Sequence, residues 1–198
     1  MAAFFCSPTI ACGRIAGVAD RSRDPNWREG EERMSVHHDD SWIALVESNK
    51  SRARVYLEFY RAIERRFGQA VAIEICKEAI YRWGRDLAAG LQAHLPGDFE
   101  GLAHSFAFAP DGGAMFQPRI DRCDKQGLDV QFEDCPLRAA WLESGLGEAE
   151  VALFCQMASA ADHGTLEAAG FAVSIETWQP GKIGCCMLKI RRRNSISP

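Results

Sequence analysis

The pattern of apolar and polar residues divides this 198-residue chain into a helical first half and a mixed second half. Residues 51–67 carry an apolar side chain at every fourth position, which predicts an α-helix that ends at Gly68. That stripe consists of Val55, Phe59, Ile63 and Phe67. A second stripe runs through residues 69–95 and predicts another helix. Gly84 weakens that helix and is typical of a site where another element approaches closely.

The second half opens with the period-two alternation of a β-strand. Residues 128–132 alternate apolar and polar side chains, which predicts a strand with one buried face. Cys135 and Pro136 follow, and proline is favoured in the first turn of a helix because its missing N–H would have no partner there. We therefore expect a helix to begin beside Cys135 and to end at Gly145.

The remaining segments complete a mixed fold. Residues 147–164 have the pattern of one helix, with Asp162 and His163 at its C-terminal end. Residues 171–178 and 183–190, joined by the turn QPGK, predict a closing β-hairpin. N-terminal helices followed by strand–helix–helix–β-hairpin indicate an α+β fold with an antiparallel sheet.

Regular patterning starts only at Met34. Residues 1–33 are broken by Gly and Pro, then polar without periodicity, and no positive segment precedes their apolar part. We expect them to form a disordered extension rather than a secretory signal. Residues 34–193 then form a single domain, which this length can supply with a sizeable core, and residues 194–198 form a tail.

Composition narrows the classes of function. The formal net charge is −4, and the only basic run is Arg191–Arg193 near the C-terminus, so the chain does not have the clustered positive charge of a nucleic-acid binder. No stretch reaches the roughly 18 apolar residues of a membrane-spanning helix. We expect a soluble protein with a small-molecule substrate and no nucleic-acid or membrane partner. The sequence leaves open whether the protein forms a homo-oligomer.

The chain contains eight cysteines, which is many for its length. Without a convincing export signal, they indicate reduced thiols in a cytoplasmic protein rather than a disulfide framework. No CxxC pair is present, which excludes a zinc ribbon and a thioredoxin-type motif. The adjacent Cys185 and Cys186 would point to opposite faces of a strand, so at most one of them is expected at a common site.

Cys135 is the strongest candidate for chemistry. The positive end of a helix dipole beside it would lower the pKa of its thiol, which suits a nucleophile or a metal ligand, although a buried structural cysteine is equally consistent. Asp162 lies two helical turns after Cys155 and hence on the same helix face. A carboxylate on that face either binds a partner inside the protein or belongs to a site. His163, rotated by about 100°, could stabilise a helix end or carry a proton near neutral pH.

Other polar clusters give weaker signals. One polar cluster is more typical of a solvent-exposed helix N-terminus than of a metal site, and it consists of His37, His38, Asp39 and Asp40. His104 and Ser105 lie in an apolar run without a recognisable nucleophile elbow.

The run FEDCPLRAAWLESGLGEAEVALFCQMASAADHG resembles the signature region of the L-2-amino-thiazoline-4-carboxylic acid hydrolase family. The elements that carry the resemblance are Cys135-Pro136, Trp141, Gly145, Cys155 and Asp162. YRWGRDLA and PGKIGCCMLKI are similar to further parts of the family pattern, so the resemblance covers roughly residues 50–190. It implies the hydrolytic opening of a small heterocycle, such as L-2-amino-thiazoline-4-carboxylate to N-carbamoyl-L-cysteine.

That reaction implies roles for particular residues. Asp162 or His163 would act as base and acid. Cys135 would be a nucleophile, or one ligand of a zinc ion that Cys155 and Asp162 complete. The substrate would contact a short set of side chains, namely Arg138 or Arg85 at its carboxylate and Trp141.

Two other classes of function remain open on the sequence. The arrangement also resembles the small-molecule or metal-binding sensor domains of the vinyl-reductase-like type, in which cysteines hold a structural metal and no reaction occurs. The plainer alternative is a helical accessory protein whose cysteines fill a core.

Overall fold

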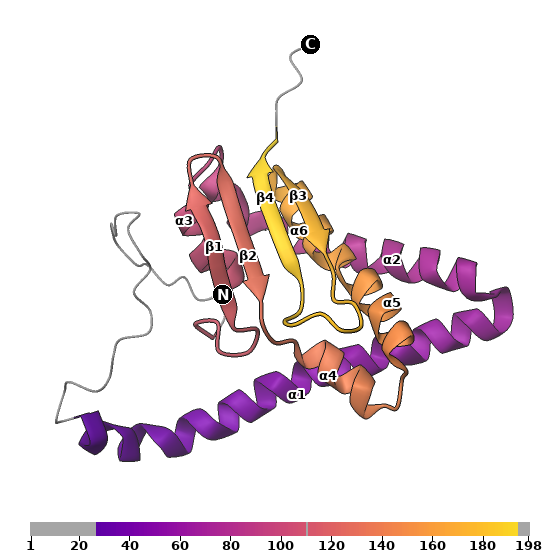
Figure 1. Cartoon of the computed structure of the whole chain (residues 1–198), viewed down its shortest axis with the longest axis horizontal. Helices are drawn as coiled ribbons and strands as arrows, with labels where there is room; N and C mark the ends of the chain where they lie inside the picture. The colour runs from indigo at the N-terminus through magenta and orange to yellow at the C-terminus, as the bar shows by residue number, and fades with distance from the viewer. Residues whose placement is uncertain (1–26, 110, 194–198) are drawn as a thin grey trace, which may run out of the picture.

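The computed structural model describes residues 27–109 and 111–193, with side chains from residue 41 onward. A long helix, α1 (Trp27–Phe67), crosses the molecule, and α2 (Gln69–Asp86) runs back beside it (Figure 1). The expected start of the domain at Met34 falls inside α1. Most of the expected extension, residues 1–26, and the expected tail, residues 194–198, lie outside the described residues.

The other elements follow in short segments. After α2 come the 3-10 turn η2 (Ala88–His94), α3 (Phe99–Leu102), the π-helical turn η3 (Ala103–Ala107), β1 (Pro118–Asp124) and β2 (Gly127–Phe132). The chain continues through α4 (Pro136–Glu143), α5 (Glu148–Ala158), α6 (Ala160–Ala169), β3 (Phe171–Glu176) and β4 (Met187–Arg192).

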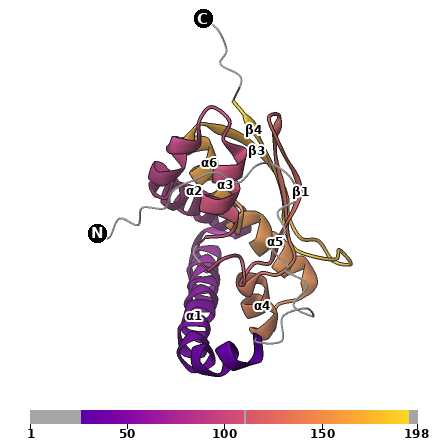
Figure 2. The same cartoon turned by 90° about the vertical axis from the view of Figure 1, so that its left-hand side faces the viewer.

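The four strands form one antiparallel sheet in the order β1-β2-β4-β3, and the helices lie on one side of it (Figure 2). The alternation read from residues 128–132 places Leu128 and Val130 in the buried interior, opposite Ile190 and Leu188 of β4. These side chains pack against Leu166 of α6 and the apolar side chains of α3. The predicted α+β fold, with N-terminal helices and an antiparallel sheet, is confirmed.

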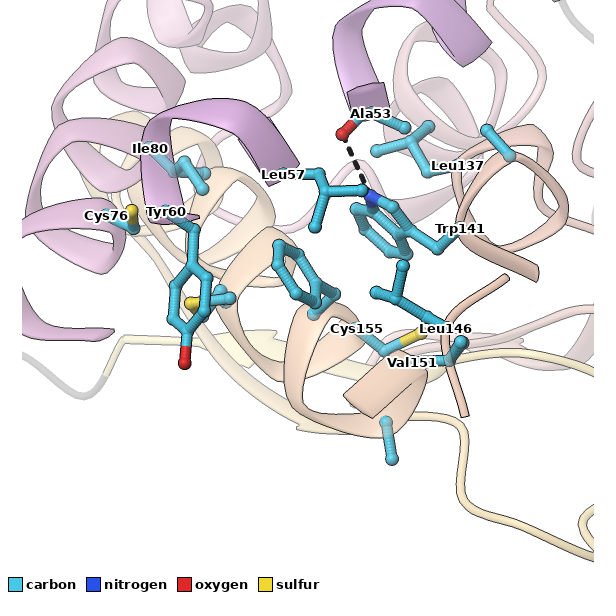
Figure 3. Packing of buried hydrophobic residues seen from close by; sticks show 14 of the residues in the cluster. Ala53, Leu57, Tyr60, Cys76, Ile80, Leu137, Trp141, Leu146, Val151 and Cys155 are labelled. Carbon is cyan, nitrogen blue, oxygen red and sulfur yellow. Dashed lines mark hydrogen bonds between the residues drawn. The ribbon is translucent and has the colours of Figure 1, made fainter. Parts of the chain in front are cut away.

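A second apolar cluster joins the helices away from the sheet (Figure 3). Trp141 of α4 is 1% exposed and donates its indole N–H to the carbonyl oxygen of Ala53 in α1 at 2.9 Å. The rings of Trp141 and Tyr60 each contact Phe154 of α5, with centroids 5.3 and 5.1 Å apart. The indole therefore ties α4 to α1, because its buried N–H finds a partner only there.

Two glycines allow α2 and α6 to cross in direct backbone contact. A Cβ atom on Gly84 would lie 2.2 Å from the carbonyl oxygen of Ala161, and one on Gly164 would lie 2.1 Å from that of Tyr81. The Thr165 hydroxyl donates to the Gly84 carbonyl oxygen across the same crossing at 2.8 Å. The close approach expected at Gly84 is therefore present, and α6 is the approaching element.

Two expectations about the segments before β2 need correction, and one strand was not foreseen. Most of the predicted stripe faces solvent in the structure, with Val55 48% and Phe59 64% exposed, and only Ile63 packs against the helical cluster. The other side of α1 packs inward. The stripe expected over residues 69–95 is helical, but α2 ends at Asp86 and η2 follows as a tighter turn. Strand β1 was not predicted, because only two of its seven residues, Ile120 and Cys123, are apolar.

The expected helix over residues 147–164 is split at Ser159 into α5 and α6. The Ser159 hydroxyl donates to the carbonyl oxygen of Gln156 at 2.9 Å, a local contact that bends helices. Asp162 and His163 thus lie at the start of α6 rather than at the end of a helix. In the described part of the chain, no helix is both long and apolar enough to cross a membrane.

Candidate active site

A cavity of about 400 Å³ lies where the helices meet the loop before β4. Its wall takes side chains from α1, α2, η3, α4, α5 and α6, so it is built from segments far apart in the sequence. The reactive groups in the wall are Cys135, Cys155, Cys185, Cys186, Asp162 and Arg52. Cys135, Cys155 and Asp162 therefore border the same cavity.

Cys135 is the N-cap residue of α4, and Pro136 occupies the first helical position, as predicted. The backbone N–H groups of Arg138 and Leu137 and the Arg138 guanidinium act to lower the pKa of the thiol. Burial acts in the opposite direction and is stronger, so the net pKa is raised. The helix start thus has the expected effect on Cys135, but desolvation outweighs it and favours the neutral thiol.

The other cavity cysteines are also protonated at neutral pH. Burial raises the pKa of both Cys185 and Cys186 to about 12, and it raises the pKa of Cys155 as well. Both residues of the adjacent pair line the cavity, contrary to the expectation that at most one would. The reason is that β4 begins at Met187, so the pair lies in the preceding loop, where strand alternation does not apply.

Asp162 is the carboxyl group of the cavity that is best suited to proton transfer. Burial raises its pKa from 3.8 to about 6, and the positive charge of Arg52 and then His163 limits the rise. Burial raises the pKa values of Tyr56 and Cys186, which border the same space, and the negative charge of Asp162 adds to the rise. A carboxyl group with a pKa near neutrality can change protonation state during a reaction.

One face of α1 supplies a part of the site that the sequence analysis missed. Leu45, Asn49, Arg52 and Tyr56 line the cavity with helical spacing. The Arg52 guanidinium donates to the Asn49 side-chain oxygen at 2.7 Å and lies 5.1 Å from the centre of the Trp83 ring. Its Nε is buried and has no hydrogen-bond partner among the described residues. Arg52 is therefore a fixed cation in the cavity wall.

The comparison with family models decides the family. Residues 48–187 match the family described as L-2-amino-thiazoline-4-carboxylic acid hydrolase. The chain belongs to this family. The match spans most of the chain and includes every cavity group named above except Leu45. No curated protein and no solved structure matched the chain significantly.

Three residues expected at the site of this L-2-amino-thiazoline-4-carboxylic acid hydrolase family member lie outside the cavity wall, namely His163, Arg85 and Arg138. His163 borders a separate surface pocket, where its Nδ1 lies 3.0 Å from Glu167. The Tyr81 hydroxyl donates to the same carboxylate at 2.9 Å. Arg85 is exposed in the last turn of α2 and borders neither pocket.

Arg138 does not line the cavity but contacts the loop before β4, which does. Its guanidinium donates to the Gly184 carbonyl oxygen at 2.9 Å and lies 5.7 Å from the centre of the Trp178 ring. These contacts hold the loop that carries Cys185 and Cys186, while the charge acts on the Cys135 sulfur. Trp141, the third residue expected to contact the substrate, does line the cavity, although it is almost fully buried.

The predicted zinc ligands Cys135, Cys155 and Asp162 border the same cavity but do not form a ligand set. Among the residues that the structure describes, no three His, Cys, Asp or Glu side chains are grouped so that they could hold a metal ion. A protein zinc site needs at least three ligands at close to 2 Å. The arrangement therefore does not fit zinc.

Proposed function

We propose that this protein hydrolyses a small cyclic amidine that carries a carboxylate, with L-2-amino-thiazoline-4-carboxylate as the primary candidate. The observation that carries the proposal is the pairing, in one cavity, of a carboxyl group of raised pKa, Asp162, with the partly unpaired guanidinium of Arg52. Membership of the family supports the same reaction class. The cavity volume of about 400 Å³ suits a small ring.

In this proposal, Asp162 acts as the general base. It removes a proton from a water molecule as the water oxygen bonds to C2 of the thiazoline ring, and the ring nitrogen takes up a proton. The C2–S bond then breaks, the oxygen becomes the carbonyl oxygen of the ureido group, and the sulfur leaves and is protonated. Because Asp162 must be ionised to accept the first proton, kcat/KM should rise as the pH increases through about 6.

Arg52 holds the ring carboxylate. A guanidinium is suited to this role because its planar N–H groups match the two oxygens of a carboxylate. The contacts with Asn49 and Trp83 fix the group before the substrate arrives, so less conformational freedom is lost on binding. An anion near Arg52 would also weaken the attraction that lowers the pKa of Asp162, which makes its carboxylate a stronger base in the complex.

Cys135 offers a second route to the same products. Its sulfur would attack C2, the ring C–S bond would break, and water would then release the product from the resulting isothiourea. This route requires that the raised pKa of the thiol be overcome by transfer of its proton to a base such as Asp162. Cys135→Ala separates the routes: unchanged turnover leaves direct attack by water, whereas loss of turnover in a folded variant supports the covalent route.

The test of the proposed function is a panel of five-membered cyclic amidines, imides and thiazolines, each with and without a carboxylate, incubated with purified protein. The expected result is ring opening of the carboxylated thiazoline, detected by chromatography. Metal content measured on the same sample shows whether turnover depends on a bound ion. Tight binding of these compounds without turnover would contradict the proposal and favour the sensor type of function.

A further inference from the structure

Three side chains that have no part in the proposed ring opening form a continuous hydrogen-bonded chain at the η3 end of the cavity. Nδ1 of His94 lies 2.8 Å from Oδ2 of Asp98, and Nε2 of the same ring lies 2.9 Å from Oγ of Ser105. Ser105 is exposed and lines the cavity, whereas His94 is largely buried. A carboxylate, an imidazole and a hydroxyl are thus aligned in that order toward the cavity.

The protonation states along this chain follow from its hydrogen bonds. Asp98 accepts from His94 and from the backbone N–H of Gly101, and both bonds lower the pKa of its carboxyl group. An ionised carboxylate only accepts hydrogen bonds, so Nδ1 of His94 must carry a proton. When the ring is neutral, Nε2 is then the acceptor, and the Ser105 hydroxyl donates to it. This is the arrangement in which a histidine withdraws the proton of a serine.

The local fold builds this arrangement from short, closely packed turns. His94 ends η2, Asp98 caps α3, and Ser105 lies in the π-helical turn η3, a conformation often found at functional sites. Gly101 leaves the necessary room, because a Cβ atom there would lie 2.1 Å from Oδ2 of Asp98 and 2.5 Å from Nδ1 of His94. Capping α3 needs only Oδ1 of Asp98, so it does not account for the contacts of Oδ2 with His94 and of His94 with Ser105.

We propose that Ser105, His94 and Asp98 form a second reactive centre, in which Ser105 is a nucleophile toward small activated acyl compounds such as esters. Oγ of Ser105 bonds to the acyl carbon while His94 takes the hydroxyl proton and passes it to the leaving alkoxide. Water then cleaves the acyl-serine with the same proton transfers and restores the hydroxyl. Asp98 keeps the imidazole oriented and stabilises its positive charge. This activity does not depend on the proposed ring opening, and either can be absent without the other.

The first experiment uses phenylmethanesulfonyl fluoride on the full chain. Oγ of the reactive serine bonds to sulfur as fluoride leaves, and intact mass with peptide mapping locates the adduct. The expected result is one adduct, at Ser105, and none on Ser105→Ala. His94→Gln should slow labelling at least about 100-fold, which is the usual contribution of a general base.

Ser159 provides the matched control. It also lines the cavity, but its hydroxyl donates to a backbone carbonyl oxygen and has no histidine partner in the described structure. Ser159→Ala should therefore be labelled at Ser105 as fast as the wild type. In the hydrolysis of p-nitrophenyl acetate, Ser105→Ala should lose activity and Ser159→Ala should retain it. Absence of an adduct on the wild type, equal labelling of Ser159, or an unchanged rate in Ser105→Ala would overturn the proposal. Thermal unfolding of each variant verifies that the fold is intact.

Discussion

Asp162 gives the stability of the protein a pH dependence of known sign. Folding raises the pKa of its carboxyl group from 3.8 to about 6, so the folded chain binds this proton more tightly than the unfolded chain. The free energy of unfolding therefore falls as the pH rises from about 4 to about 6 and stays lower above that range. A shift of this size corresponds to about 2–3 kcal/mol at neutral pH.

Replacing Asp162 by Asn should make the protein more stable at pH 8. The amide carries no charge to desolvate, so the expected gain is about 1–3 kcal/mol at pH 8 and close to none at pH 4. Urea denaturation at the two pH values measures it. Asp86→Asn, at an exposed position, is the control and should change little at either pH. A variant that is less stable than the wild type at pH 8 would show that the carboxylate is well compensated in the fold.

Arg52 should decide whether the substrate needs a carboxylate. Arg52→Gln is expected to lower kcat/KM for the carboxylated thiazoline by about 10- to 100-fold, the usual value of a hydrogen-bonded charge pair. The same change should have little effect on the ring without a carboxylate. Arg54→Gln is a matched control, because Arg54 is 47% exposed and pairs with Glu47 and Glu143. Equal losses on both rings would remove Arg52 from carboxylate recognition.

For individual residues, the sequence singled out candidate groups of the cavity better than the side chains that surround them. Cys135 and Asp162 could be singled out because a cysteine before a helix-starting proline and a carboxylate on an apolar helix face are unusual. Arg52 could not, since α1 is rich in arginines and only packing distinguishes the one that faces the cavity. Its spacing of three or four residues from Asn49 and Tyr56 was the available signal.

The crossing of α2 and α6 is the contact between elements that tolerates least change. Gly84→Ala places a methyl group 2.2 Å from the Ala161 carbonyl oxygen, and a backbone atom cannot move aside as a side chain can. We expect a loss of about 3 kcal/mol or more, measured by thermal or urea unfolding. Gly90→Ala is the control, because nothing lies within 4 Å of a Cβ atom there. Similar stability of the two variants would contradict the observed crossing.

Elements with a strong periodic pattern were predicted, and elements that depend on their neighbours were not. The alternation at 128–132 and the Pro136 start of α4 are confirmed. Strand β1 has a polar sequence because it lies at the edge of the sheet, where β2 is its one strand partner among the described residues. The exposed stripe of α1 has the spacing of a buried one, and periodicity cannot distinguish the two.

For the whole molecule, the cavity depends on how α1 lies across the later helices and the loop before β4 (Figure 1). That placement brings Arg52, Asp162 and Cys186 into the wall of one cavity, although they are spread over more than half of the sequence. Local patterns contain no information on such long-range packing, which is why the sequence predicted the fold class but only part of the site. Self-association, left open by the sequence, stays a prediction that light scattering on the purified chain can test.

Ring opening with Asp162 as the base is tested directly by the conversion of L-2-amino-thiazoline-4-carboxylate to N-carbamoyl-L-cysteine, followed by chromatography for the wild type and Asp162→Asn. Wild-type protein should open the ring, and the variant should be at least about 100-fold slower in kcat. Glu167→Gln, beside His163 and outside the cavity, should retain activity. Absence of product with the wild type would exclude this ring-opening activity. An Asp162→Asn rate within a few-fold of the wild-type rate would exclude Asp162 as the general base.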